Sequence, residues 1–243
     1  MTLPEPTILG FDTSAAHCAA ALLMNGKIVA ERFEEMKKGQ AERLFPMLDE
    51  VMGDVGAVWE ELDSIGVGTG PGNFTGTRVS VSAARGLALS LSVPAIGVSG
   101  FEAMAGPQLL GEGTRMIVSI PSERRDSDVM LQLFEGGVRS GEPVELGLND
   151  KAPYDRERIM HLPVDTFVCG ERADLLDCIF NERRGFLSNY RSLKGSSREA
   201  ASSVARVAAW RMTAGHTVQA PAPLYIRPPD AAPSADPSPV ILP

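Results

Sequence analysis

The feature that most limits how this chain can fold is a glycine-rich turn at residues 69–78, Thr-Gly-Pro-Gly-Asn-Phe-Thr-Gly-Thr-Arg. An apolar run precedes the turn and a helical pattern follows it, so it joins a buried strand to a helix. Glycine permits positive φ and close backbone approach, and Thr75 suits the N-cap of a helix that begins at Gly76. Backbone N–H groups in such a turn are directed at whatever lies above them. The sequence therefore predicts that function lies near this turn.

The composition of the chain is typical of a globular protein without a strongly basic surface. The chain has 243 residues, 44% hydrophobic and 22% charged, which is enough for one domain or for two lobes of about 100 residues each. A net charge of −8 argues against strong non-specific binding to a phosphate backbone. Cys18, Cys169 and Cys178 form no C-x-x-C pair, which indicates a reducing compartment. Without a basic leader or a long apolar run, the protein is expected to be cytoplasmic, with no membrane segment.

The first half of the chain alternates strands with helices. Three short strands are predicted at 7–11, 17–24 and 27–33, and Asn25-Gly26 between the last two favours a type I′ hairpin turn. Apolar residues at helical spacing follow in 43–52, and Pro46 indicates that this helix begins at 42 or 43. A strand at 64–68, the glycine turn, a helix at 76–91, a strand at 94–98 and a helix at 101–110 complete the order. This βββαβαβα pattern predicts an α/β fold with a mixed sheet and helices on its faces.

The second half loosely repeats the first. Apolar runs predict strands at 116–120 and 129–134, and glycines at 136, 137 and 141 indicate a hairpin. A strand at 165–170, a helix at 171–180 and an Ala-rich helix at 198–212 that ends at Gly215 follow. Six prolines fall in the last sixteen residues, which predicts a disordered tail. The expected divisions are a first lobe at 1–110, a smaller second lobe at 111–227 and the tail at 228–243.

Two kinds of site are not expected. His17, His161 and His216 are scattered, with no H-x-x-x-H or H-E-x-x-H spacing, so the sequence predicts no metal site. No G-x-S-x-G elbow is present, and Ser99 has no visible histidine partner, so a hydrolytic triad is not expected either.

Two interpretations are open for the residues around the glycine turn. Asp12, Thr13 and Ser14 follow the first strand, where they could contact a phosphate or hold a metal-bound water, or could only cap a tight turn. The glycine turn lacks the G-K-[ST] of a P-loop and has Arg78 as its nearby cation, so phosphate binding and helix packing both fit it. The candidate phosphate-binding residues are Asp12, Thr13, Ser14, Gly70, Gly72, Asn73, Thr75, Gly76 and Arg78.

Four strings together resemble the TsaB (YeaZ) family: Ile-Leu-Gly-Phe-Asp-Thr-Ser at 8–14, Glu-Arg-Leu-Phe-Pro-Met-Leu at 42–48, Gly-Thr-Gly-Pro-Gly-Asn-Phe-Thr-Gly-Thr-Arg at 68–78, and Leu-Tyr-Ile-Arg at 224–227. The resemblance implies an actin-like ATPase (ASKHA, ribonuclease H-like) fold of two lobes, each with a mixed βββαβα sheet. It also implies a non-catalytic relative of the threonylcarbamoyl transferase TsaD. Such a protein acts with TsaD and the ATPase TsaE to make threonylcarbamoyladenosine in transfer RNA.

The resemblance further implies a partner surface. In the family the helices at 43–52 and 76–91 meet TsaD, or a second copy in a homodimer, and transfer RNA is contacted only indirectly. No catalytic residue, metal or intrinsic cofactor is expected, and ATP or ADP is expected only at the level of the complex. The expected interface is drawn from Leu44, Phe45, Met47, Leu48, Val51, Ser80, Ala84 and Leu87. The competing hypothesis is an ATP-dependent carbamoyl or phosphoryl transferase that uses Asp12 and the glycine turn.

The chain departs from the family pattern in two places. Ala41 stands where family members commonly have a histidine at the start of the first helix. Pro121-Ser122-Glu123-Arg124 replaces the usual Asp-Ala-Arg string of the second lobe, and Met130 stands in the strand that follows. Roles that depend on those family residues cannot be transferred to this chain.

Overall fold

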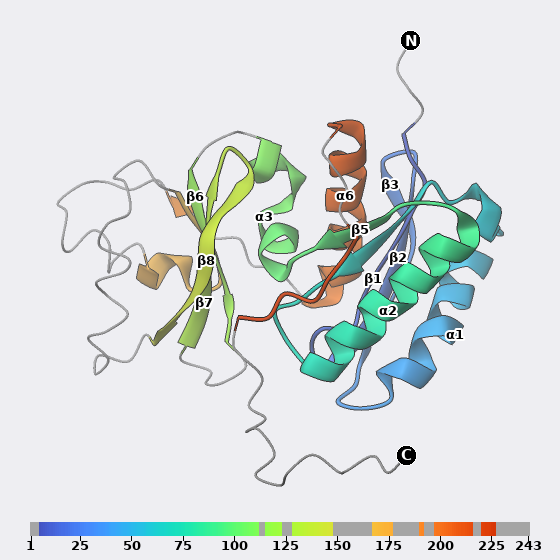
Figure 1. Cartoon of the computed structure of the whole chain (residues 1–243), viewed down its shortest axis with the longest axis horizontal. Coiled ribbons are helices and arrows are strands. Elements are labelled where there is room, and N and C mark those ends of the chain that lie inside the picture. Colours follow the sequence, from blue (N-terminus) through green and yellow to red (C-terminus); the bar gives the residue numbers. More distant parts are fainter. Residues whose placement is uncertain are drawn as a thin grey trace, which may run out of the picture.

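The protein consists of two α/β lobes that lie side by side (Figure 1). The computed structural model describes residues 5–111, 115–122, 128–147, 167–176, 190–191, 197–215 and 220–226. Each lobe is built on one five-stranded sheet. This arrangement confirms the expected mixed α/β architecture.

The first sheet contains the strands predicted from the opening apolar runs. These are β1 (Ile8–Asp12), β2 (His17–Met24), β3 (Lys27–Glu35), β4 (Ser64–Gly68) and β5 (Ala95–Val98). Their order is β3-β2-β1-β4-β5, antiparallel on the β2 and β3 side of β1 and parallel on the β4 and β5 side. Asn25 and Gly26 have φ of 48° and 70°, the positive values that a type I′ turn needs. The predicted hairpin is therefore confirmed.

Helices cover both faces of this sheet. They are α1 (Gln40–Gly53), α2 (Phe74–Leu91) and α6 (Ala200–Thr213). Helix α3 (Gly100–Gly111) packs instead against α6 and β6, and short 3₁₀ turns lie at Trp59–Glu61 and Ser197–Glu199. Leu9 and Phe11 of β1 belong to the cluster that includes the buried residues of α1, whereas Ile8 belongs to the cluster that includes α6. Successive strand residues point to opposite faces, so α1 and α2 lie on one face and α6 lies on the other (Figure 1).

The predicted starts of both outer helices were wrong by two or three residues. Helix α1 begins at Gln40 after Gly39, whose φ of 89° only glycine adopts easily. Pro46 therefore lies inside the helix. Because proline has no N–H, the Glu42 carbonyl receives no intrahelical hydrogen bond, and water can reach it since Glu42 is exposed. Helix α2 begins at Phe74, and its cap is Asn73 rather than Thr75, because Asn73 Oδ1 accepts from the Gly76 N–H at 2.8 Å.

The second sheet repeats the topology of the first. Its strands are β6 (Met116–Pro121), β7 (Asp128–Glu135), β8 (Val138–Gly147), β9 (Phe167–Gly170) and β10 (Tyr190–Arg191). Strand β6 pairs antiparallel with β7, which pairs antiparallel with β8, and β6 pairs parallel with β9, which pairs parallel with β10. Gly136 and Gly137, with φ of 59° and 77°, form the predicted hairpin turn. Gly141 lies instead in an irregular part of β8, opposite Gln132.

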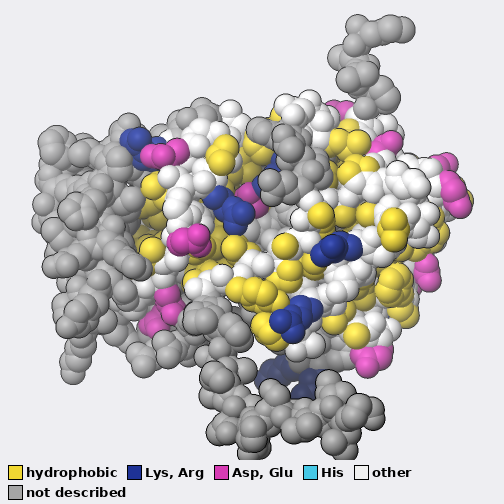
Figure 2. Space-filling view, in the orientation of Figure 1, with side chains coloured by type: hydrophobic (Ala, Val, Ile, Leu, Met, Phe, Trp, Pro, Cys, Tyr) yellow, Lys and Arg dark blue, Asp and Glu magenta, His cyan; other side chains and the backbone are white. Residues whose placement is uncertain are grey.

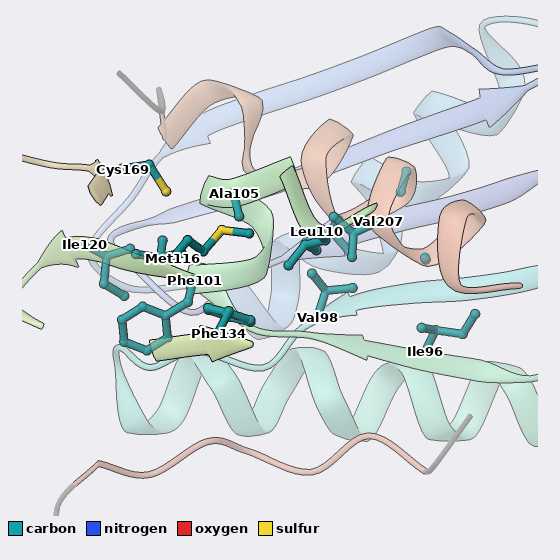
Figure 3. Close-up of a cluster of buried hydrophobic side chains, with 14 of the residues drawn as sticks. Ile96, Val98, Phe101, Ala105, Leu110, Met116, Ile120, Phe134, Cys169 and Val207 are labelled. Atoms are coloured by element: carbon teal, nitrogen blue, oxygen red, sulfur yellow. The ribbon is translucent and has the colours of Figure 1, made fainter. Parts of the chain in front are cut away.

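The two lobes share one apolar core. Figure 3 shows Ile96 and Val98 of the first sheet, Phe101 of α3, and Met116 and Phe134 of the second sheet in a single cluster. Burial of such side chains contributes on the order of 1.5–3 kcal/mol each. The lobes are therefore packed against each other and are not merely joined by linkers.

The last described helix returns to the first lobe. Helix α6 comes from the second half of the chain, yet its backbone lies against β1, where a Cβ at Gly10 would be 2.7 Å from the Ala201 carbonyl oxygen.

The division of the chain into two lobes near residue 110 stays a prediction. Several sequence-based predictions lie outside the described residues: His161, Cys178, His216, Glu123, Arg124, Arg227, the helix beyond residue 176 and the tail at 228–243. Among the described helices, none has the length and apolar character needed to span a membrane.

Candidate functional site

The glycine turn closes the space above β4. A Cβ at Gly68 would be 2.5 Å from the Asp12 carboxyl carbon, so only glycine fits between β4 and that side chain. The Thr69 N–H donates to the Val98 carbonyl at 2.9 Å, and the Thr69 carbonyl accepts from the Leu224 N–H at 2.8 Å. Gly70 has a φ of 80°. The turn is thus held between β5 and the segment at 220–226.

The turn between β1 and β2 touches the start of α2 directly. Thr13 Oγ1 donates to the Gly76 carbonyl at 2.7 Å, and the Asn73 N–H donates to the Ser14 carbonyl at 2.5 Å. A Cβ at Gly76 would collide with the Thr13 carbonyl oxygen. The two segments that sequence analysis singled out are therefore brought together, and their backbones fill the space between them.

Asp12 adopts the geometry of a turn cap. Its Oδ1 accepts from the Ser14 N–H at 2.6 Å, and only 8% of the residue is exposed. Its Oδ2 lies 3.7 Å from Nε2 of the buried His17. That Nε2 has no hydrogen-bond partner among the described residues. The turn-capping interpretation fits this geometry, because an aspartate that accepts from the N–H two residues on forms an Asx turn.

Arg78 is turned away from Asp12 and toward the surface. Its guanidinium carbon lies 3.6 Å from the centre of the Phe74 ring, and its Nε donates to the Tyr225 hydroxyl at 2.8 Å. Phe74 and Tyr225 also contact each other, with ring centres 5.3 Å apart. Sequence reasoning missed this cluster, although both partners fall within the strings at 68–78 and 224–227. The cation near the glycine turn therefore joins α2 to the C-terminal segment.

Most of the predicted interface residues lie in the core. Leu44, Met47, Leu48, Val51, Ser80 and Ala84 are all buried in the chain itself. In this conformation those six cannot touch a partner, because their side chains already pack against the first sheet or, for Ser80, bond to the Gly68 carbonyl. The other two differ, since Phe45 is 48% exposed and Leu87 is partly buried. Only these two are available as contact residues.

The outer faces of α1 and α2 carry a different apolar set. Leu89 is 84% exposed, and Phe74 is exposed as well as Phe45. Figure 2 shows hydrophobic side chains over this pair of helices, among a few basic ones. Phe45 was among the predicted interface residues, whereas Phe74 and Leu89 were missed, because single apolar residues without periodicity give no signal in the sequence.

The described residues contain no cluster of three metal-ligating side chains. Cys18 and Cys169 are buried. Burial raises the pKa of the Cys18 thiol to about 11, and Glu34 and Asp12 add to that effect against the opposing charge of Arg43. The Cys18 thiol is therefore protonated at neutral pH and is a poor nucleophile or metal ligand.

Several known proteins are similar to this chain. The family model described as TsaD, tRNA N6-adenosine threonylcarbamoyltransferase, matches residues 27–124. A TsaB protein of Escherichia coli, named for tRNA threonylcarbamoyladenosine biosynthesis, is 32% identical over 61% of this chain and 65% of its own length. A protein of the same name from Haemophilus influenzae is 32% identical over 55% of this chain and 56% of its own. The matched region thus spans less than two thirds of these relatives.

Solved structures agree over a longer region. A Pseudomonas aeruginosa protein described as similar to peptidase YeaZ superposes with a TM-score of 0.61 and 25% identity, over 91% of this chain and all of that one. The ROK hexokinase of Thermus thermophilus has a TM-score of 0.55 at 13% identity, over 86% of this chain and all of that one, which shows the actin-like fold alone. The chain is thus similar to the TsaB/YeaZ proteins over most of its length and to the TsaD family model at residues 27–124.

Proposed function

We propose that this chain is a non-catalytic, cytoplasmic subunit in the formation of threonylcarbamoyladenosine in transfer RNA. Its partner is a TsaD-like transferase, and a TsaE-like ATPase joins at the level of the complex. The observation that carries the proposal is the similarity to the E. coli protein named for this pathway. The match to the TsaD family model at residues 27–124 includes α1 and α2. When no transferase is present, a second copy of the chain takes the partner's place.

The outer faces of α1 and α2 support the partner-binding role. Phe45 and Leu89 are large apolar side chains left in water, and such residues contribute to interfaces when they gather on one face. Gly86 of α2 is also exposed, with no atom within 4 Å of where a Cβ would be. A partner helix could approach closely at that position, because small residues permit close helix packing.

The glycine turn supports a non-catalytic role. In the competing hypothesis of an ATP-dependent carbamoyl or phosphoryl transferase, phosphates would lie between Asp12 and the glycine turn. Here the Thr13 carbonyl and the start of α2 occupy that space, and Asp12 Oδ1 is engaged by Ser14. Arg78, the candidate phosphate-binding cation, packs on Phe74 instead. ATP or ADP binding at the complex level stays a prediction.

The charge of the chain supports an indirect role toward RNA. With a net charge of −8, the chain lacks the basic excess that holds a phosphate backbone. We therefore assign the contact with transfer RNA to the transferase.

Reconstitution tests the proposal. A cognate TsaD-like transferase and TsaE-like ATPase are incubated with transfer RNA, an activated threonylcarbamoyl donor and Mg-ATP, with and without this chain. Nucleoside mass spectrometry should detect threonylcarbamoyladenosine only when the chain is present. The isolated chain should release no phosphate from Mg-ATP. Equal modification without the chain, or phosphate release by the chain alone, would contradict the proposal.

A further inference from the structure

The outer face of α1 carries negative charge that nothing nearby balances. Glu42 and Asp49 are exposed, and neither forms an ion pair with a described residue. The third carboxylate of α1, Glu50, is bound by Arg43 at 2.7 Å. Two carboxylates on this helix are therefore available to a partner.

The outer face of α2 is basic. This helix contains Arg78 and Arg85 and no acidic residue, and both arginines are exposed. Arg85 forms no ion pair with a described residue. Arg78 is held by Phe74 and Tyr225, but only its Nε is hydrogen-bonded there. A guanidinium has five N–H groups, so those on its terminal nitrogens are available to an acceptor. Figure 2 shows the contrast, with basic side chains over α2 and acidic ones toward α1.

The charges on the two helices have the same spacing. Glu42 and Asp49 are seven positions apart on α1, and so are the two arginines on α2. Seven residues make about two helical turns, or roughly 10.5 Å. The first member of each pair lies near the start of its helix, since α1 begins at Gln40 and α2 at Phe74.

The two helices also run in the same direction. Strands β3, β4 and β5 are parallel to one another in the first sheet. Helix α1 connects the end of β3 to the start of β4, and α2 connects the end of β4 to the start of β5. Both helices therefore run opposite to these strands, and each acidic side chain lies at nearly the height of an arginine.

A second copy of the chain can face this helix pair in two symmetric ways. A twofold axis that crosses the helices sets α1 against α1 and α2 against α2, so like charges meet and oppose the contact. A twofold axis along the helices sets α1 against α2 of the other copy, in the same direction. Opposite charges then meet at matching heights, and symmetry repeats each contact. The charge pattern thus favours the second arrangement.

We propose that α1 and α2 bind a second copy of this chain in the arrangement with the twofold axis along the helices. Glu42 pairs with Arg78 of the other copy. Asp49 pairs with Arg85 of the other copy, and symmetry repeats both ion pairs. Phe45, which lies between the two carboxylates on α1, supplies apolar surface at the centre of the contact. The inference rests on the proposed use of these outer faces as a contact surface, and it adds the charge pairs that set the orientation.

Charge exchange at one ion pair tests the arrangement. Asp49→Arg gives both helices a basic residue at this contact, and Arg85→Asp gives both an acidic one. Each variant alone should self-associate at least about tenfold more weakly than the parent chain in sedimentation equilibrium, because like charges then face each other. An equimolar mixture of the two variants should recover the parent affinity, and so should a chain that carries both substitutions. Self-association of the parent chain should weaken between about 0.05 M and about 0.5 M sodium chloride.

A control variant and the contrary outcomes complete the experiment. Glu31 is exposed on β3 and faces α6, so Glu31→Arg should self-associate like the parent chain. The inference is overturned if the parent chain stays monomeric up to about 100 μM, or if its self-association does not weaken with salt. It is also overturned if the single variants self-associate like the parent, or if their mixture associates no more tightly than either alone. The measurement contains no transferase, so it can fail while transfer RNA modification still depends on the chain.

Discussion

The two sheets have the same strand order and pairing, yet their central strands meet the rest of the protein differently. In the first sheet, Gly10 of β1 pairs with Gly66 of β4, whereas in the second sheet Val118 of β6 pairs with Cys169 of β9. The glycine pair lets the backbone of α6 lie directly on the first sheet. The second sheet packs through the side chains of Val118 and Cys169. The same strand topology is thus packed by close backbone contact in the first lobe and by apolar side chains in the second.

The outer surfaces of the lobes differ as well. The first sheet is covered by α1 and α2, whose buried stripes face the sheet and whose outer faces expose Phe45 and Leu89. In the second lobe, Ala173 and Leu176 pack on the sheet, and Leu175 is the exposed apolar residue beside them. Among the described residues, α1 and α2 thus expose three large apolar side chains, and the segment that packs on the second sheet exposes one.

The comparison predicts opposite sensitivities at the central strands. Gly10→Val places a branched side chain against the Ala201 carbonyl and Ala205, and should lower the free energy of unfolding by about 3 kcal/mol or more. Val118→Ala only removes volume and should cost about 1–3 kcal/mol. Urea denaturation of both variants measures the difference. If Gly10→Val destabilised the protein less than Val118→Ala, the contact between the backbones of α6 and β1 would not require glycine at position 10.

The link between α6 and the first lobe can be broken at Arg211. Arg211→Met leaves the buried Glu102 carboxylate without its cation and should cost about 3 kcal/mol. The double variant Glu102→Gln with Arg211→Met removes both charges and should recover much of that loss. The measurement is the denaturant midpoint of unfolding for the parent chain, Arg211→Met and the double variant. A single variant as stable as the parent chain would mean that the ion pair contributes nothing to this junction.

The pH dependence of stability provides a test within the first sheet. The folded state holds the Cys18 thiol proton up to a pKa of about 11, whereas an exposed thiol releases it at an ordinary pKa near 9. Folding therefore retains a proton that the unfolded chain has lost, and stability falls as pH rises from about 9 to 11, by about 2 kcal/mol. Cys18→Ala should show a shallower loss over that window. The free energy of unfolding of both proteins is measured at pH 8 and pH 10.5. An equal loss between these pH values in the two proteins would show that the Cys18 thiol does not cause the pH dependence.

The smallest expected effect is a gain. Gly86 lies within α2, and a Cβ there meets no atom within 4 Å. Gly86→Ala should stabilise the isolated chain by about 0.5–1 kcal/mol, because alanine favours the helix. Thermal unfolding measures this gain. A loss of stability would show that a side chain at Gly86 is not tolerated, and would remove the contrast between Gly86 and the crowded Gly10 and Gly66.

The sequence predicted the strands well because period-two apolar runs and turn residues mark them directly. The starts of α1 and α2 depended on Gly39 and Asn73, where one φ value or one side-chain bond decides the boundary. Helical periodicity located Leu44, Met47 and Val51, but periodicity marks the buried stripe of a helix, so it predicted core residues where contact residues were sought. The sequence analysis did not predict the capping pair of Ser99 and Glu102, although S-x-x-E spacing is a signal for it. Its link to Arg211, more than 100 positions away, has no such signal.

The most direct test of the partner surface is the affinity of the double variant Phe45→Glu and Leu89→Glu for the cognate TsaD-like transferase. Both residues are exposed, so the variant should keep the parent chain's unfolding midpoint. Charges in a desolvated contact should weaken binding by at least about 30-fold. Val29→Glu, at an exposed apolar position on β3, should bind the transferase like the parent chain. Unchanged affinity of the double variant would contradict the claim that the outer faces of α1 and α2 meet the partner.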